Sequence, residues 1–127
     1  MRDLAGDDRR RKDCILVVED EYFIAMELQA ALIDGGFEVL GPVGSVSDAL
    51  TLLASHRPDA AVLDFNLGKE TVAPVASRLK EMGVSFVLAT ATNQIELAKA
   101  TALDGAPNVG KPTDMDRLIA LIRALLA

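Results

Sequence analysis

The chain has 127 residues, half of them apolar and a quarter charged, which is typical of one globular domain with a buried core. Its formal net charge of −6 argues against nonspecific binding to nucleic acid or to an anionic membrane. A single cysteine, Cys14, excludes a disulfide framework, and a single histidine, His56, argues against a histidine-based metal site or a Ser-His-Asp triad. Apolar runs are too short to span a bilayer.

Residues 1–13 are polar, carry charges of both signs and hold five of the thirteen basic residues. We therefore predict a flexible N-terminal tail over 1–13 and one folded domain over 14–127. The apolar run that follows this tail ends at Glu19, which makes it too short for a signal peptide. We accordingly expect a cytoplasmic protein.

Apolar runs alternate along the chain with stretches in which apolar residues recur every three or four positions. The runs predict five strands, at 15–18, 37–40, 60–63, 84–89 and 108–110. The periodic stretches predict five helices, at 22–33, 45–55, 71–82, 93–103 and 118–126. Capping-box spacing, Ser45 with Asp48 and Thr113 with Asp116, is expected to begin the second and the last of these helices.

Five alternations of strand and helix predict an α/β domain with a mostly parallel sheet covered by helices on both faces. Right-handed crossovers restrict this domain to a few doubly wound orders, and we expect the flavodoxin-like order 2-1-3-4-5, with five strands and five helices.

Chemically useful residues stand where the predicted strands end: Glu19, Asp20, Asp64, Thr90 and Lys111. In the order 2-1-3-4-5 the first and third strands are neighbours, so Asp20 and Asp64 come together at the switch point. Carboxylates that close repel one another, and a divalent cation relieves the repulsion. Oxygen ligands with open water positions favour Mg²⁺.

The remaining strand ends suit phosphoryl chemistry. Lys111 offers a compact positive charge to one phosphoryl oxygen, and Thr90 offers a hydroxyl donor to another. Asp64 is then free to attack phosphorus and form an acyl phosphate, a nucleophilic role that carboxylates can perform.

Four motifs follow one another at these strand ends: VVEDE at 17–21, VLDFNLG at 62–68, LATA at 88–91 and KP at 111–112. In this order they resemble the motifs of two-component response-regulator receiver domains, over about residues 14–127. The resemblance implies that Asp64 is the phosphoacceptor and that Mg²⁺ is bound by Asp20, Asp64 and the backbone carbonyl of Asn66, with Glu19 acting through water.

The same resemblance implies that Thr90 and Lys111 sense the phosphoryl group, that Ala91 keeps the acceptor accessible and that the Lys111–Pro112 bond is cis. The chain departs from the family at Asn108, where receivers often carry an aromatic switch residue, and at Thr113, where an aromatic often follows the Lys-Pro pair. Rotation of an aromatic ring toward Thr90 is therefore unavailable, and the signal must be read differently.

As a receiver domain, the chain is expected to be a signalling phosphoacceptor whose only catalysis is its own phosphorylation and dephosphorylation. The phosphodonor would be a sensor histidine kinase or a histidine phosphotransfer protein. Further motifs resemble stand-alone receivers paired with HWE/HisKA2-type kinases of alphaproteobacteria: GPVGSV at 41–46, NLG at 66–68 with ETV at 70–72, and FVLATAT at 86–92. We expect no output domain after Ala127, and we therefore expect the signal to pass to an unknown downstream protein or into a phosphate relay. We expect no nucleic-acid or membrane partner, and a monomer or weak dimer.

Three other functions share some of these sequence features. Residues 105–113 nearly form a phosphate-binding P-loop, but Pro112 stands where the Mg²⁺-binding hydroxyl is needed. A haloacid-dehalogenase-like phosphatase needs a carboxylate two residues after Asp64, and Asn66 is there. The third is a pseudo-receiver, a protein-docking module of the same fold that is not regulated by phosphorylation.

Overall fold

The computed structural model describes residues 11–91 and 106–127. The predicted helix at 93–103 and most of the predicted tail lie outside these residues. The elements are β1 (Cys14–Val18), α2 (Tyr22–Asp34), β2 (Glu38–Val43), α3 (Val46–Ser55), β3 (Ala60–Leu63), β4 (Asn66–Leu67), β5 (Glu70–Thr71), α4 (Ala73–Met82), β6 (Ser85–Leu88) and α6 (Met115–Leu126). Among the helices of this described part, none is both long and apolar enough to cross a bilayer.

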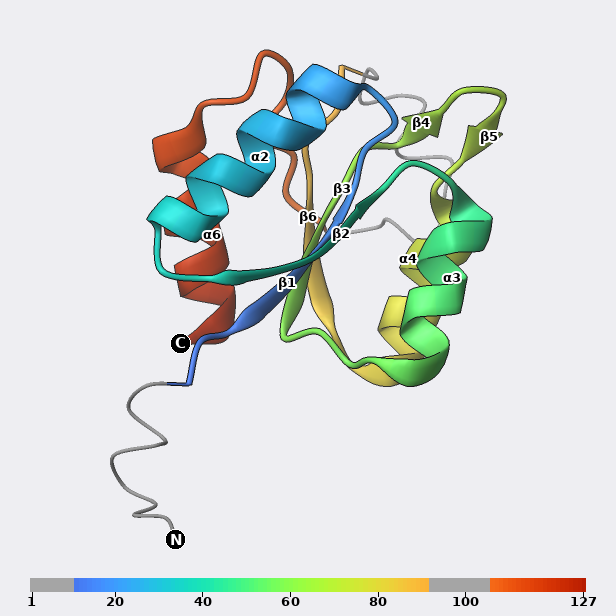
Figure 1. Cartoon of the computed structure of the whole chain (residues 1–127), viewed down its shortest axis with the longest axis horizontal. Coiled ribbons are helices and arrows are strands. Elements are labelled where there is room, and N and C mark those ends of the chain that lie inside the picture. Colours follow the sequence, from blue (N-terminus) through green and yellow to red (C-terminus); the bar gives the residue numbers. More distant parts are fainter. Residues whose placement is uncertain (1–10, 92–105) are drawn as a thin grey trace, which may run out of the picture.

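The central sheet has the order β2-β1-β3-β6, and its strands pair in parallel. Helices α2 and α6 cover one face and α3 and α4 cover the other (Figure 1). The doubly wound fold is therefore confirmed. The fifth strand predicted at 108–110 is reduced to a single parallel bridge between Leu88 and Asn108, because the chain turns at Gly110, whose φ is +77°.

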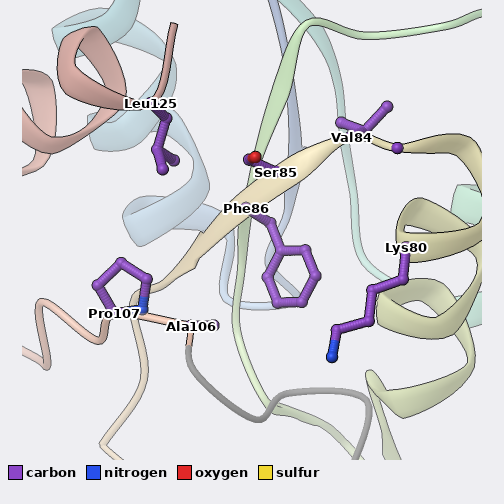
Figure 2. Close-up of a pocket in the computed structure, with 8 residues that line it drawn as sticks. Lys80, Val84, Ser85, Phe86, Ala106, Pro107 and Leu125 are labelled. Atoms are coloured by element: carbon purple, nitrogen blue, oxygen red, sulfur yellow. The ribbon is translucent and has the colours of Figure 1, made fainter.

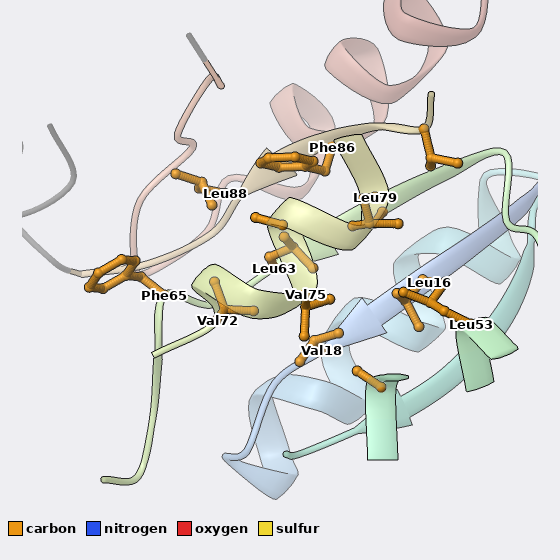
Figure 3. Packing of buried hydrophobic residues seen from close by; sticks show 14 of the residues in the cluster. Leu16, Val18, Leu53, Leu63, Phe65, Val72, Val75, Leu79, Phe86 and Leu88 are labelled. Carbon is orange, nitrogen blue, oxygen red and sulfur yellow. The ribbon is translucent and has the colours of Figure 1, made fainter. Parts of the chain in front are cut away.

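The inner strands are apolar throughout because both of their faces are covered. In β1, Leu16 and Val18 face the core beneath α3 and α4, whereas Ile15 and Val17 face the core beneath α2 and α6. Figure 3 shows the first of these cores, built from side chains of three strands, two helices and the segments next to them: Leu16, Val18, Leu53, Leu63, Phe65, Val72, Val75, Leu79, Phe86 and Leu88. This packing holds the carboxyl ends of β1, β3 and β6 in fixed relative positions.

A short hairpin replaces the loop predicted after β3. Its strands β4 and β5 pair Asn66 with Thr71 and Leu67 with Glu70. Gly68, with φ of +65°, occupies the first position of the two-residue turn, as a type II′ turn requires. Because Thr71 belongs to β5, α4 begins at Ala73 and the predicted start at residue 71 is wrong.

The second strand is longer than predicted. It continues through Gly41 and Pro42, which we expected to end it, and the bond between them is cis. Proline is tolerated here because β2 is an edge strand, and the pairing of β1 with β2 shifts in register at this point.

The helix caps agree with prediction at one position and not at the other. The Ser45 hydroxyl accepts a hydrogen bond from the Asp48 N–H (3.1 Å), so Ser45 is the expected N-cap of α3. The N-cap of α6 is Asp114, which accepts from the Arg117 N–H, and the cap predicted at Thr113 is wrong. The Thr113 hydroxyl is used elsewhere, because it donates to the Gly110 carbonyl (2.9 Å).

Candidate functional site

The two buried carboxylates follow directly on the buried strands. The Asp64 N–H donates to the Val18 carbonyl, and the Glu19 N–H donates to the Val43 carbonyl, both at 2.9 Å. The sheet pairing thus continues one residue past β1 and β3 and fixes both backbones at the carboxyl edge of the sheet. Oxygen atoms of Glu19, Asp20 and Asp64 lie within 4.8 Å of one another. The predicted convergence of these three residues is present.

Lys111 lies among these carboxylates. Its Nζ is 2.9 Å from Asp64 Oδ2, 3.0 Å from Glu19 Oε1 and 3.5 Å from Glu21 Oε1. The contact with Asp64 is a hydrogen bond, whereas Glu19 Oε1 is an ion-pair partner without hydrogen-bond geometry. Glu21 was not among the predicted site residues, although its position directly after Glu19 and Asp20 was a signal. One ammonium group therefore contacts three acids and offsets a single negative charge among them.

Burial decides how Glu19 titrates. The Glu19 side chain is 1% exposed, and this burial raises its pKa from 4.5 to about 7. The hydrogen bond from the Glu21 N–H and the contact with the Lys111 ammonium act in the opposite direction, and the negative charge of Asp64 adds to the rise. Burial acts to lower the pKa of Lys111, but the hydrogen bond to Asp64 and the contact with Glu19 outweigh it and raise that pKa. Lys111 consequently stays charged.

Because the pKa of Glu19 is raised in the folded state, we expect the free energy of unfolding to depend on pH. Because the native carboxyl binds its proton more tightly than the unfolded one, this residue lowers the free energy of unfolding as pH rises from about 4.5 to about 7. Glu19→Gln is expected to remove that part of the slope, up to about 3 kcal/mol. Urea unfolding of wild type and variant from pH 5 to pH 8 measures it. Parallel slopes would contradict the prediction, and the exposed Glu27→Gln is the matched control.

A cleft of about 280 Å³ opens above Asp64. Four of the five predicted strand-end residues line it: Asp20, Asp64, Thr90 and Lys111. The fifth, Glu19, lies behind this lining and contacts Lys111. Thr90 is buried in its wall and Ala91 is exposed. The lining residues are Asp20, Glu21, Asp64, Asn66, Gly68, Thr90, Ala91 and Lys111.

The donor set of this cleft fits a hard divalent cation. Glu19, Asp20 and Asp64 supply carboxylate oxygens only, and Glu19 Oε1 is a buried oxygen without a hydrogen-bond partner. Gly44 lies against Asp20, and a Cβ there would come 3.2 Å from the Asp20 Cα, so a larger residue would press on the backbone of Asp20. These carboxylates would hold Mg²⁺. The role of the Asn66 carbonyl stays a prediction, and Asn66 lies in β4 at the rim of the cleft.

A second hollow, of about 380 Å³, lies at the opposite end of β6 (Figure 2). Its described lining is mostly apolar, and Lys80 is the one ionisable side chain among these residues: Lys80, Gly83, Val84, Ser85, Phe86, Ala106, Pro107 and Leu125. It lacks the carboxylates that the predicted chemistry requires. The acidic cleft is therefore the candidate site.

The fold and the cleft define a class: a flavodoxin-like α/β domain with an acidic site and a lysine at the carboxyl edge of its sheet. The family model described as the response regulator receiver domain matches residues 15–123. The chain belongs to this family, the receiver domains of two-component systems.

Relatives agree with this assignment. The chain is 29% identical over 110 residues to the transcriptional regulatory protein PdtaR of Mycobacterium tuberculosis, covering 85% of this chain and 54% of PdtaR. It is 37% identical over 114 residues to the transcriptional regulatory protein DltR of Streptococcus agalactiae, covering 86% of this chain and 50% of DltR. The chain thus spans about half the length of these curated relatives.

Solved structures match the fold over most of the chain. The signal receiver domain of a modulated diguanylate cyclase from Desulfovibrio desulfuricans has a TM-score of 0.82 and 25% identity, covering 91% of this chain and 94% of that one. The response regulator PhyR from Brucella abortus has a TM-score of 0.76 and 24% identity, covering 97% of this chain and 53% of that one.

Proposed function

We propose that the chain receives a phosphoryl group on Asp64 from the phosphohistidine of a sensor histidine kinase or a histidine phosphotransfer protein. The observation that carries this proposal is the position of Asp64 Oδ2, buried at the base of the cleft and 2.9 Å from the Lys111 ammonium. A carboxylate oxygen attacks phosphorus, the P–N bond breaks, and its electron pair returns to the donor imidazole. The product is an acyl phosphate, which water later hydrolyses.

The other residues stabilise charge during this transfer. Lys111 contacts Asp64 in the resting protein and offers its charge to a phosphoryl oxygen once Asp64 is substituted. Thr90, in the wall of the same cleft, offers its hydroxyl to another oxygen. Asp20, Asp64 and the backbone carbonyl of Asn66, with Glu19 acting through water, would hold Mg²⁺, which would screen the charge between the carboxylate and the phosphoryl group.

The proposal extends to the cellular setting. We assign the chain to the stand-alone receivers paired with HWE/HisKA2-type kinases, acting in the cytoplasm as a monomer or weak dimer. Its phosphorylated form would act on a downstream protein or pass the phosphoryl group onward. Catalysis would be limited to its own phosphorylation and dephosphorylation.

The test uses acetyl phosphate as a small phosphodonor. With Mg²⁺ the wild-type chain is expected to gain the mass of one phosphoryl group, and hydroxylamine is expected to remove it, as an acyl phosphate requires. Removing Mg²⁺ with EDTA is expected to suppress the gain. Beryllofluoride with Mg²⁺ should raise the melting temperature without covalent change. Absence of both effects would overturn the proposal and favour a pseudo-receiver that docks proteins without phosphorylation.

A further inference from the structure

The backbone pairing between β6 and the segment that carries Lys111 ends early. The Leu88 N–H donates to the Pro107 carbonyl (2.7 Å), and the Val109 N–H donates to the Leu88 carbonyl (2.8 Å). These two bonds form one parallel bridge around Asn108. A further step of the same ladder would pair Thr90 with backbone groups of residues 109 and 111. The turn at Gly110 (φ +77°) interrupts the ladder first.

The side chain of Asn108 supplies the pairing that the interrupted strand does not. Asn108 Oδ1 accepts from the Thr90 N–H (3.3 Å), and Asn108 Nδ2 donates to the Thr90 carbonyl (3.4 Å). A carboxamide carries the same donor and acceptor as a peptide group, so it can substitute for one in a ladder. Thr90 is 2% exposed, and buried backbone groups need such partners.

The same oxygen also contacts the lysine segment. Asn108 Oδ1 accepts from the Gly110 N–H at 2.8 Å, which is shorter than either bond to Thr90. The orientation of the amide is determined by this network, because a flipped amide would turn its NH₂ group toward two N–H donors. One side chain therefore connects the backbone of Thr90 to the residue that precedes Lys111.

We propose that Asn108 is a positioning residue that sets the Thr90 hydroxyl and the Lys111 ammonium relative to each other across the cleft. This role rests on the proposed function, in which these two groups flank the phosphoryl group on Asp64. Small displacements of groups that stabilise a transition state lower the rate strongly. Losing the contacts of Asn108 is expected to slow phosphorylation by acetyl phosphate on the order of tenfold, which corresponds to about 1.4 kcal/mol.

The experiment compares two variants that remove the amide. Asn108→Ala removes the side chain, and Asn108→Leu keeps a similar volume without a hydrogen-bonding group. Both are expected to accelerate amide exchange at Thr90 and Gly110, measured by NMR with Mg²⁺ present, and to slow phosphorylation as above. The matched control is Val109→Ala, which shortens a buried side chain in the next position. It is expected to lower the melting temperature while leaving both the Thr90 exchange rate and the phosphorylation rate unchanged.

The possible results distinguish a failure of the positioning role of Asn108 from a failure of the proposed function. If wild type and the Asn108 variants are phosphorylated at equal rates, the positioning role is wrong while the proposed function stands. The same conclusion follows if Val109→Ala slows phosphorylation as much as Asn108→Ala, because the effect would then be one of stability. If the wild-type chain takes no phosphoryl group at all, the proposed function fails and the positioning role fails with it.

Discussion

Replacing Asp64 with asparagine is expected to reduce phosphoryl incorporation to background. An amide is not a nucleophile toward phosphorus, so an acyl phosphate cannot form at this position. The fold should persist, because Lys111 retains the charge of Glu19 at 3.0 Å. Mass spectrometry after incubation with acetyl phosphate and Mg²⁺ measures incorporation, and far-UV circular dichroism checks the fold.

The matched control for this variant is Asp34→Asn, which changes an exposed carboxylate at the end of α2, outside the cleft. It should be phosphorylated like the wild type. Incorporation into the folded Asp64→Asn variant at the wild-type rate would show that another carboxylate, such as Asp20, accepts the phosphoryl group.

Replacing Lys111 with methionine is expected to lower the free energy of unfolding by about 3 kcal/mol at neutral pH in the absence of metal. Breaking a buried ion pair on one side leaves its partners uncompensated, and here the Glu19 and Asp64 side chains are 1% and 6% exposed. Mg²⁺ should recover much of the loss, and its apparent affinity should rise, because the ammonium no longer competes for Asp64. Urea unfolding across a Mg²⁺ titration measures both quantities.

Acid should also reduce the penalty of Lys111→Met, because protonation of Glu19 removes one of the two uncompensated charges. The control is Lys69→Met, which replaces an exposed lysine in the turn between β4 and β5. Its stability should not depend on Mg²⁺ more than that of the wild type. A Lys111→Met protein as stable as the wild type without metal, and with the same affinity for Mg²⁺, would contradict this account of the cleft.

The fold followed from sequence wherever a local pattern is long enough. The run at Ala60–Leu63 and the four apolar residues before Glu19 indicated buried strands because turn signals follow both runs, and the pairing of these strands brings Glu19 and Asp64 together. The hairpin of β4 and β5 was missed because two-residue strands have no measurable period. Its one signal was Gly68, the residue that a type II′ turn requires.

The charged residues of the site could be predicted from the sequence, but the hydrogen bonds between its segments could not. Strand ends identified Asp20, Asp64 and Lys111, since parallel strands bring their carboxyl ends to one edge. The contacts of Asn108 with Thr90 join residues 18 positions apart. They depend on where the last strand stops, which is a tertiary property. The sequence showed only that Asn108 stands where receivers often carry an aromatic residue, and it gave no sign of these hydrogen bonds.

The position of Lys111 has a consequence for how the protein depends on its environment. Since its ammonium offsets one of the two negative charges of Glu19 and Asp64, part of the repulsion between these carboxylates is relieved in the folded state without a divalent cation. The amount of folded protein and its ability to be phosphorylated would therefore depend on magnesium to different extents. Under the proposed Mg²⁺-dependent transfer, a shortage of magnesium would stop phosphorylation of Asp64 before it reduced the amount of folded protein, and phosphorylation could resume on repletion without new protein synthesis.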